Sequence, residues 1–173
     1  MPTESKKKSE KKDFTAIIIA GFFFLLQFVL FMYNYNFLGY ELLIWTGWLL
    51  LIPGFLLVSL SMSRLEESNI LEEASTSTFC TKGVYEIVRH PLSLGWILLA
   101  VGFTFISQYW LSLYCLIIQL PLIVFDVICE EEFLEKRFDG EYRRYQDTVP
   151  MMNIFSGVSN YFRRFEKSSS ETS

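Results

Sequence analysis

The residues best suited to chemistry lie where a charged segment meets an apolar one. Arg89, His90 and Pro91 run directly into "LSLGW", and His90 is the only histidine among the 173 residues. Proline is tolerated in the first turn of a helix, because its missing N–H would have no partner there. We therefore expect a helix to begin at Pro91. Backbone amides at a helix start, an arginine and an imidazole together favour an anionic group such as a carboxylate or a phosphate. A simpler interpretation is an interfacial pair that reaches lipid headgroups.

A second candidate lies in the segment "CEEEFLEKRFDGEYRRYQ", which has helical periodicity. Its apolar stripe recurs every three or four residues and contains Glu131, Leu134, Phe138, Tyr142 and Tyr145. A carboxylate in line with such a stripe needs a cation beside it, unless Glu131 is simply a glutamate at a helix start. Gly140 is expected to break the helix after Asp139.

These residues must be positioned by unusually apolar elements. The chain is 51% hydrophobic and 17% aromatic, and residues 14–33 form a stretch of 20 residues without a charge. About 20 apolar residues span a bilayer as a helix. The predicted fold is therefore an all-α integral membrane protein with about four transmembrane helices, the last two forming a short hairpin, plus a cytosolic loop and a C-terminal helix. The predicted spans are residues 14–33, 37–61, 92–107 and 111–128.

The distribution of basic residues predicts the topology. Of the 15 Lys and Arg, five lie in residues 6–12, three between Arg64 and Arg89, and seven after Glu135. By the positive-inside rule, both termini and the 62–91 loop face the cytosol, so the protein is predicted to be multi-pass. One domain is expected over residues 14–165, between disordered tails at 1–13 and 166–173.

Other classes of function find little support in the sequence. No basic stripe with interleaved aromatic residues indicates nucleic-acid binding. One histidine and no C-x-x-C motif leave no plausible metal site.

Two separated motifs together resemble the isoprenylcysteine carboxyl methyltransferase family and its phospholipid-methylating relatives. "GVYEIVRHPLSLGW" carries the Gly-x-Tyr and Arg-His-Pro-x-x-x-Gly elements, and "EEEFLEKRFDGEYRRY" follows about 35 residues later with the Glu-Glu-x-x-Leu and Glu-Tyr-x-x-Tyr elements. The resemblance covers roughly residues 78–150. It implies an integral membrane methyltransferase that uses S-adenosyl-L-methionine and acts on a lipidic or prenylated substrate at the cytosolic face.

The resemblance also assigns roles to individual residues. The candidate catalytic residues rest on chemistry instead: Arg89 suits the carboxylate of the cofactor, and Glu130 suits a base. The candidate cofactor-binding residues are Thr78, Tyr85, His90, Pro91, Leu92, Ser93 and Glu131. Methyl transfer is an in-line displacement that depends on alignment and desolvation. An amine acceptor would also need a base, which Glu130 or Glu131 would provide.

Three departures from the family pattern leave alternatives open. Ser93 replaces a tyrosine, Asp139-Gly140 displaces a glycine by one position, and Val127 replaces the arginine that holds the substrate carboxylate in the prenylcysteine enzymes. The substrate is therefore a prenylcysteine carboxylate, a phospholipid amine or another amphiphile. The competing interpretations are a non-catalytic membrane scaffold or lipid-binding protein that keeps the fold, and a relative of sterol reductases, which share a similar Arg-His-Pro module but are much larger.

Overall fold

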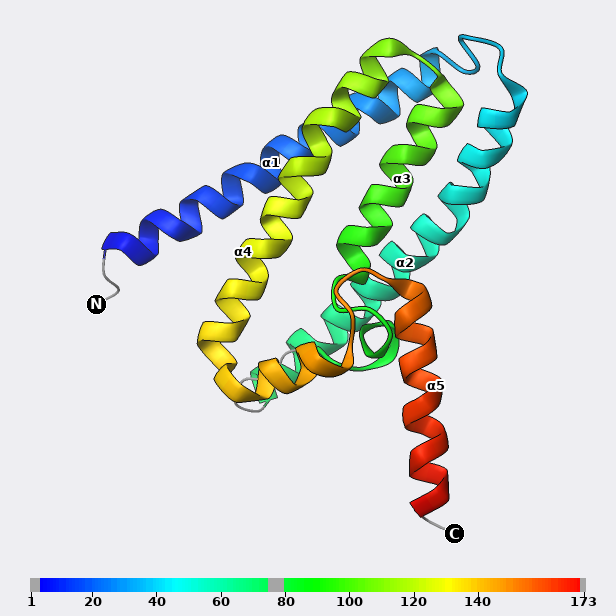
Figure 1. The fold of residues 1–173 in the computed structure, drawn as a ribbon. Coiled ribbons are helices and arrows are strands. Elements are labelled where there is room, and N and C mark those ends of the chain that lie inside the picture. The colour runs from blue at the N-terminus through cyan, green and yellow to red at the C-terminus, as the bar shows by residue number, and fades with distance from the viewer. Residues whose placement is uncertain (1–3, 75–79, 172–173) are drawn as a thin grey trace. The chain divides into compact units, whose positions relative to one another are not determined.

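The computed structural model describes residues 4–74 and 80–171, and these residues form helices and connecting turns without a strand. The elements in chain order are α1 (Glu4–Tyr33), α2 (Glu41–Ala74), the 3₁₀-helix η1 (Gly83–Glu86), α3 (Pro91–Ser107), α4 (Trp110–Thr148) and α5 (Ile154–Glu171) (Figure 1). The all-helical prediction is confirmed for this part of the chain.

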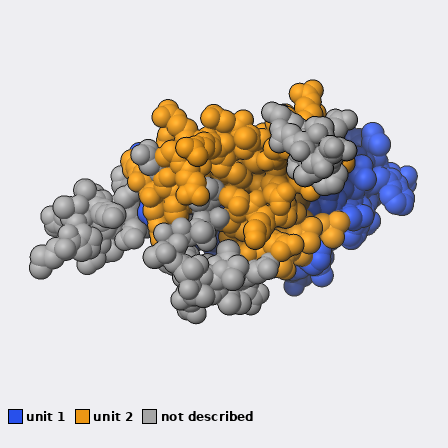
Figure 2. Space-filling model, turned by 90° about the horizontal axis from the view of Figure 1, so that it is seen from below, with its two compact units in different colours: residues 1–55, 96–133 blue, residues 56–95, 134–173 orange. Residues whose placement is uncertain are grey.

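The chain divides into two compact units (Figure 2). Unit 1 comprises residues 1–55 and 96–133, and unit 2 comprises residues 56–95 and 134–173. Helices α2, α3 and α4 each contribute a segment to both units. The single domain expected over residues 14–165 stays a prediction.

Two helices are long and apolar enough to cross a membrane, in the segments Glu41–Leu65 and Trp110–Phe138. Ile18–Tyr33 and Pro91–Ser107 are apolar but shorter. Two membrane-crossing candidates are thus present among the described residues, and the four-span topology with cytosolic termini stays a prediction.

Several helices are longer than the apolar segments that the sequence predicts to span the membrane. α1 begins at Glu4 and α5 ends at Glu171, over segments where disordered tails were expected. α2 continues to Ala74, well past the predicted span. The expected break after Asp139 is wrong, because α4 runs through Gly140 to Thr148. A glycine costs a helix only about 1 kcal/mol relative to alanine, and good helix formers flank this one on both sides.

In unit 1, polar side chains join α1 to α3 and α4. Gln27 of α1 is fully buried, and its Nε2 donates to the carbonyl of Ala100 at 3.0 Å and to that of Ser112 at 3.4 Å. Gln119 of α4 donates in the opposite direction, to the carbonyl of Ala20 at 3.3 Å. The bonding between α1 and α4 is therefore reciprocal: Gln27 of α1 donates to the backbone of Ser112, and Gln119 of α4 donates to the backbone of Ala20. On each helix the donating glutamine and the accepting carbonyl are seven residues apart. Interhelical hydrogen bonds of this kind are typical of helices packed in a membrane.

The turns at one end of unit 1 are also paired. The amide of Asn36 donates to the carbonyl of Ile106 at 2.9 Å. The side chain of Gln108 bonds both the amide and the carbonyl of Tyr40, at 3.0 and 2.7 Å. The α1–α2 and α3–α4 turns thus lie together.

Candidate functional site at the start of α3

The segment before α3 begins with a conformation that favours glycine. Gly83 has φ +69°, a left-handed value that costs other residues more. Its amide donates to the Glu86 carboxylate at 3.1 Å, and this bond closes the single turn of η1. A Cβ at Gly83 would lie 2.9 Å from Nε of Arg64. The glycine of the Gly-x-Tyr motif is therefore explained by the turn that precedes Tyr85.

Tyr85 is buried and linked to the C-terminal part of α4. The Tyr145 hydroxyl donates to the Tyr85 carbonyl at 2.6 Å. The ring centroids of Tyr142 and Tyr145 lie 5.9 Å apart, and Tyr142 is 1% exposed. The two tyrosines of the Glu-Tyr-x-x-Tyr element thus pack together inside unit 2, and the second supports the loop before α3.

Burial raises the pKa of the Tyr145 hydroxyl well above its ordinary value. Tyr142 adds to this effect, whereas the positive charge of Arg89 opposes it. The phenol is therefore a neutral hydrogen-bond donor at physiological pH, and Arg89 lies near enough to act on it electrostatically.

Tyr145→Phe is expected to lower the free energy of unfolding by about 1 kcal/mol, the usual net value of one hydrogen bond. Because the folded pKa is raised, the contribution of Tyr145 is fully present below the unfolded pKa of about 10. It is lost as the pH rises from there through the raised value. Thermal unfolding in detergent should therefore show a difference between wild type and variant that is constant near neutral pH and shrinks in alkali. An equal difference at every pH would contradict this assignment.

The backbone of Arg89 and His90 is fixed by the segment that follows α4. The Arg89 amide donates to the Pro150 carbonyl at 3.1 Å, and the His90 amide donates to the Met151 carbonyl at 3.2 Å. Two consecutive bonds set both the position and the register of this short stretch. The conformation of the Arg-His pair therefore depends on residues about 60 positions later in the chain.

α3 begins at Pro91, as the sequence predicts. The His90 carbonyl accepts the first helical bond, from the Leu94 amide at 3.1 Å, so His90 occupies the cap position and Pro91 is the first helical residue. The amides of Arg89 and His90 are engaged by Pro150 and Met151, which leaves those of Leu92 and Ser93 as the helix-start donors. An anion at this site would bind one turn further into α3 than an anion held by the Arg89 and His90 amides.

The His90 side chain and part of the Arg89 side chain are withdrawn from the surface. His90 is 4% exposed, and Nε and Nη1 of Arg89 are buried. An arginine and a histidine that reached lipid headgroups would expose their polar ends. The burial of these atoms therefore argues against the simple interfacial interpretation and favours an internal role for both residues.

α5 packs on the same loop. Asn153 caps the helix by accepting the Ser156 amide at 3.1 Å. A Cβ at Gly157 would lie 1.9 Å from the Ile87 carbonyl oxygen, so only glycine allows this approach. Nη2 of Arg164 donates to the Glu86 carbonyl at 2.7 Å. Residues 86–90 are thus held by backbone and side-chain contacts from residues 150–164.

The glutamates lie on α4 in the part that belongs to unit 1. Glu131, Leu134, Phe138 and Tyr145 are partly buried and Tyr142 is buried, while Glu130, Glu132 and most of their neighbours are exposed. The predicted stripe is therefore the more buried face of the helix. The roles of Glu130 and Glu131 stay predictions. Thr78 lies outside the described residues.

Unit 2 thus brings together Tyr85, Arg89, His90 and the first turn of α3. The sequence reasoning gave no site role to Tyr145, Pro150, Met151, Gly157 or Arg164. The second tyrosine of Glu-Tyr-x-x-Tyr was a usable signal for Tyr145. No local sequence pattern marks the other four residues, because their contacts join segments that are distant in the sequence. Among residues 4–74 and 80–171, no group of three or more His, Cys, Asp and Glu side chains is arranged to hold a metal.

The model of one protein family, described as phospholipid methyltransferase, matches residues 42–141. This range includes α3, the loop before it and the three consecutive glutamates of α4. No curated protein matches the chain. No solved structure matches it either.

Proposed function

Since the chain belongs to the phospholipid methyltransferase family, we propose that it is an integral membrane enzyme that uses S-adenosyl-L-methionine to methylate the amine headgroup of a phospholipid. This family is part of a clan of membrane methyltransferases that also includes the isoprenylcysteine enzymes. The all-helical fold and the two long apolar helices agree with membrane association.

The main support for this proposal is the pair of backbone hydrogen bonds that fixes Arg89 and His90 against Pro150 and Met151. These bonds place a half-buried arginine, whose Nε and Nη1 are buried, and a buried histidine immediately before the N-terminus of an apolar helix. Such fixed geometry is unnecessary for residues that only anchor a helix in headgroups. It is expected where a ligand must be aligned.

The donor set fits the amino-acid end of the cofactor. That end carries a carboxylate, for which the Arg89 guanidinium and the amides of Leu92 and Ser93 are suitable donors. Tyr85 and Pro91 are proposed to shape the same site, and His90 to orient the ligand. The family motif assigns Glu131 to cofactor binding, and the ammonium group of the cofactor is proposed as the partner of its carboxylate. When bound, S-adenosyl-L-methionine supplies an electrophilic methyl group on a sulfonium.

Transfer to an amine also requires removal of a proton from nitrogen. Glu130 is exposed and is proposed as the base that accepts this proton. Arg89 is proposed to keep the reacting groups in line through its contact with the cofactor. Neither residue forms a covalent intermediate in this scheme.

The substrate preference follows from the environment of Val127. This position, where the prenylcysteine enzymes have a carboxylate-binding arginine, is occupied by an apolar side chain that is 1% exposed. It offers no partner for a substrate carboxylate. An amine headgroup avoids that requirement and agrees with the matched family.

The test is methyl transfer by the purified full chain in lipid nanodiscs with isotopically labelled S-adenosyl-L-methionine. Label should enter phosphatidylethanolamine in the nanodisc, and mass spectrometry should locate the methyl group on nitrogen. Label only in an added farnesyl-cysteine would overturn the proposed substrate. If S-adenosylhomocysteine binds saturably but neither phosphatidylethanolamine nor farnesyl-cysteine is labelled, the proposal that the protein methylates either acceptor is wrong. Absence of that binding would favour the non-catalytic scaffold.

His90→Ala is expected to weaken S-adenosylhomocysteine at least about tenfold, because a hydrogen bond to a charged group contributes about 1.5–3 kcal/mol. His90→Gln keeps an amide donor and most of the volume, so a smaller loss is expected. Ser93→Tyr restores the residue of the resembled family and should be tolerated or improve binding. Calorimetry measures all three affinities, and thermal melts identify variants that only unfold. Unchanged affinity in a folded His90→Ala protein would remove His90 from the site.

A further inference from the structure

α5 presents two different faces. Gly157, Tyr161 and Arg164 recur at intervals of four and three residues and so share one side of the helix. Gly157 approaches the Ile87 carbonyl and Arg164 bonds the Glu86 carbonyl. This side is therefore the docked face, held against the loop that leads into α3.

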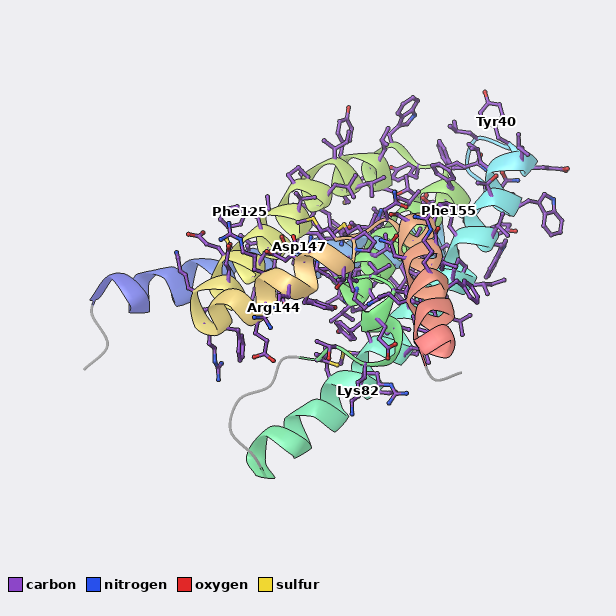
Figure 3. All side chains as sticks on the ribbon, turned by 60° about the horizontal axis from the view of Figure 1, so that its bottom comes forward. Tyr40, Lys82, Phe125, Arg144, Asp147 and Phe155 are labelled. Atoms are coloured by element: carbon purple, nitrogen blue, oxygen red, sulfur yellow. The ribbon has the colours of Figure 1, made fainter. Side chains whose placement is uncertain are left out.

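The opposite side carries two exposed phenylalanines, with the exposed Ser159 beside them. At 100° per residue, Phe155 and Phe162 lie about 20° apart and roughly opposite the docked face. They are 91% and 65% exposed, and the adjoining Arg163 is also exposed. Figure 3 labels Phe155 on the first turn of α5. α5 is the most strongly amphipathic of the described helices.

The position of α5 along the chain indicates what this outer face meets. The docked face holds Glu86 and Ile87, and the apolar helix α3 begins only four residues after Ile87. All of these residues belong to unit 2. α5 is therefore fixed beside the point where the chain passes from a polar loop into an apolar helix.

We propose that the outer face of α5, formed by Phe155, Phe162 and Arg163, rests on the surface of a phospholipid bilayer. The two phenylalanine rings enter the boundary between headgroups and acyl chains, and Arg163 pairs with lipid phosphates. A helix with aromatic residues on one side and basic residues beside them is suited to lie in this plane. The proposal needs only the membrane placement that is part of the proposed function, and not methyl transfer itself.

A second copy of the chain fits this face less well. Each phenylalanine buries about 150–250 Å² at most, whereas a stable interface buries about 1,200–2,000 Å² in total. Two rings and an arginine on one side of a single helix fall short of that area. A bilayer has no such minimum, because the rest of the protein already holds the chain there.

The test places the photoreactive analogue p-benzoylphenylalanine at position 155, 162 or 161 of the full chain in nanodiscs of phosphatidylcholine and phosphatidylglycerol. After irradiation, mass spectrometry should find lipid adducts at 155 and 162. At 161, on the docked face, it should find crosslinks within the chain instead. Dimer crosslinks at 155 would overturn the proposal in favour of a second copy, and unreacted analogue at 155 and 162 would overturn it in favour of a solvent-exposed face.

A functional measurement separates this proposal from the proposed activity. If the wild-type chain methylates lipid, the double variant Phe155→Ser, Phe162→Ser should lose severalfold in turnover of bilayer-embedded acceptor. Its affinity for S-adenosylhomocysteine in detergent should not change. An inactive wild type would contradict the proposed function and leave the crosslinking result to decide on the α5 surface. Equal turnover by wild type and double variant would count against the bilayer contact.

Discussion

Gly157→Ala should destabilise the protein, and Gly140→Ala should stabilise it, although both replace a glycine inside a helix. A new Cβ at Gly157 would lie 1.9 Å from the Ile87 oxygen and 2.9 Å from the Ile87 carbonyl carbon. These are backbone atoms and cannot rotate away, so α5 must separate from the loop. Overpacking costs about 1–3 kcal/mol, and a clash with rigid backbone atoms belongs at the upper end of this range, above the gain of about 1 kcal/mol in helix propensity.

Gly140 is the matched control because a Cβ there would meet nothing within 4 Å. Only the propensity gain remains, so stability should rise by about 0.5–1 kcal/mol. Thermal unfolding of both variants in the same detergent gives the comparison. Gly157→Ala should also weaken S-adenosylhomocysteine, because the displaced loop carries Arg89 and His90. A stabilising Gly157→Ala would mean that α5 does not dock on Ile87.

Glu131→Gln is expected to weaken S-adenosylhomocysteine between about tenfold and a hundredfold. The reason is the charge-assisted hydrogen bond proposed between this carboxylate and the ammonium group, which S-adenosylhomocysteine shares with the methyl donor and which contributes about 1.5–3 kcal/mol. Three consecutive glutamates allow a charge-matched series. Glu131 is partly buried, whereas Glu130 and Glu132 are exposed.

The three substitutions should therefore separate by measurement. Glu130→Gln should lower turnover with little change in cofactor affinity, because a base acts on the acceptor and not on the bound cofactor. Glu132→Gln should change neither quantity. If calorimetry finds the same affinity for all three variants and wild type, Glu131 returns to the role of a surface glutamate.

Hydropathy and helix-start rules predicted the parts of the fold that depend on local sequence. Pro91 begins α3, and Tyr142 lies buried on the stripe read from spacing alone. Both follow from short-range physics, namely the missing proline N–H and the period of a helix. Gly140 was misjudged because one weak helix former does not outweigh its neighbours.

The contacts that fix the candidate site were beyond the reach of such rules. The register of Arg89 and His90 on Pro150 and Met151 uses main-chain atoms, which every residue carries. Gly157 matters only because Ile87 lies against it. No spacing within a single segment encodes which distant backbone will approach. The family motif identified the residues near the site, and the structure shows what holds them.

The reciprocal glutamines of unit 1 have a consequence for biogenesis. Gln27 is part of α1, which the predicted four-span topology places in the membrane, yet its acceptors lie 73 and 85 residues later in the chain. Until α3 and α4 are translated, its amide must sit in lipid or be held by another component, and an unsatisfied polar group there is costly. In that topology, insertion of α1 is therefore provisional. It becomes permanent only when the second half of the chain arrives, so a truncated product that ends before α4 should be recognised as unfinished by membrane quality control.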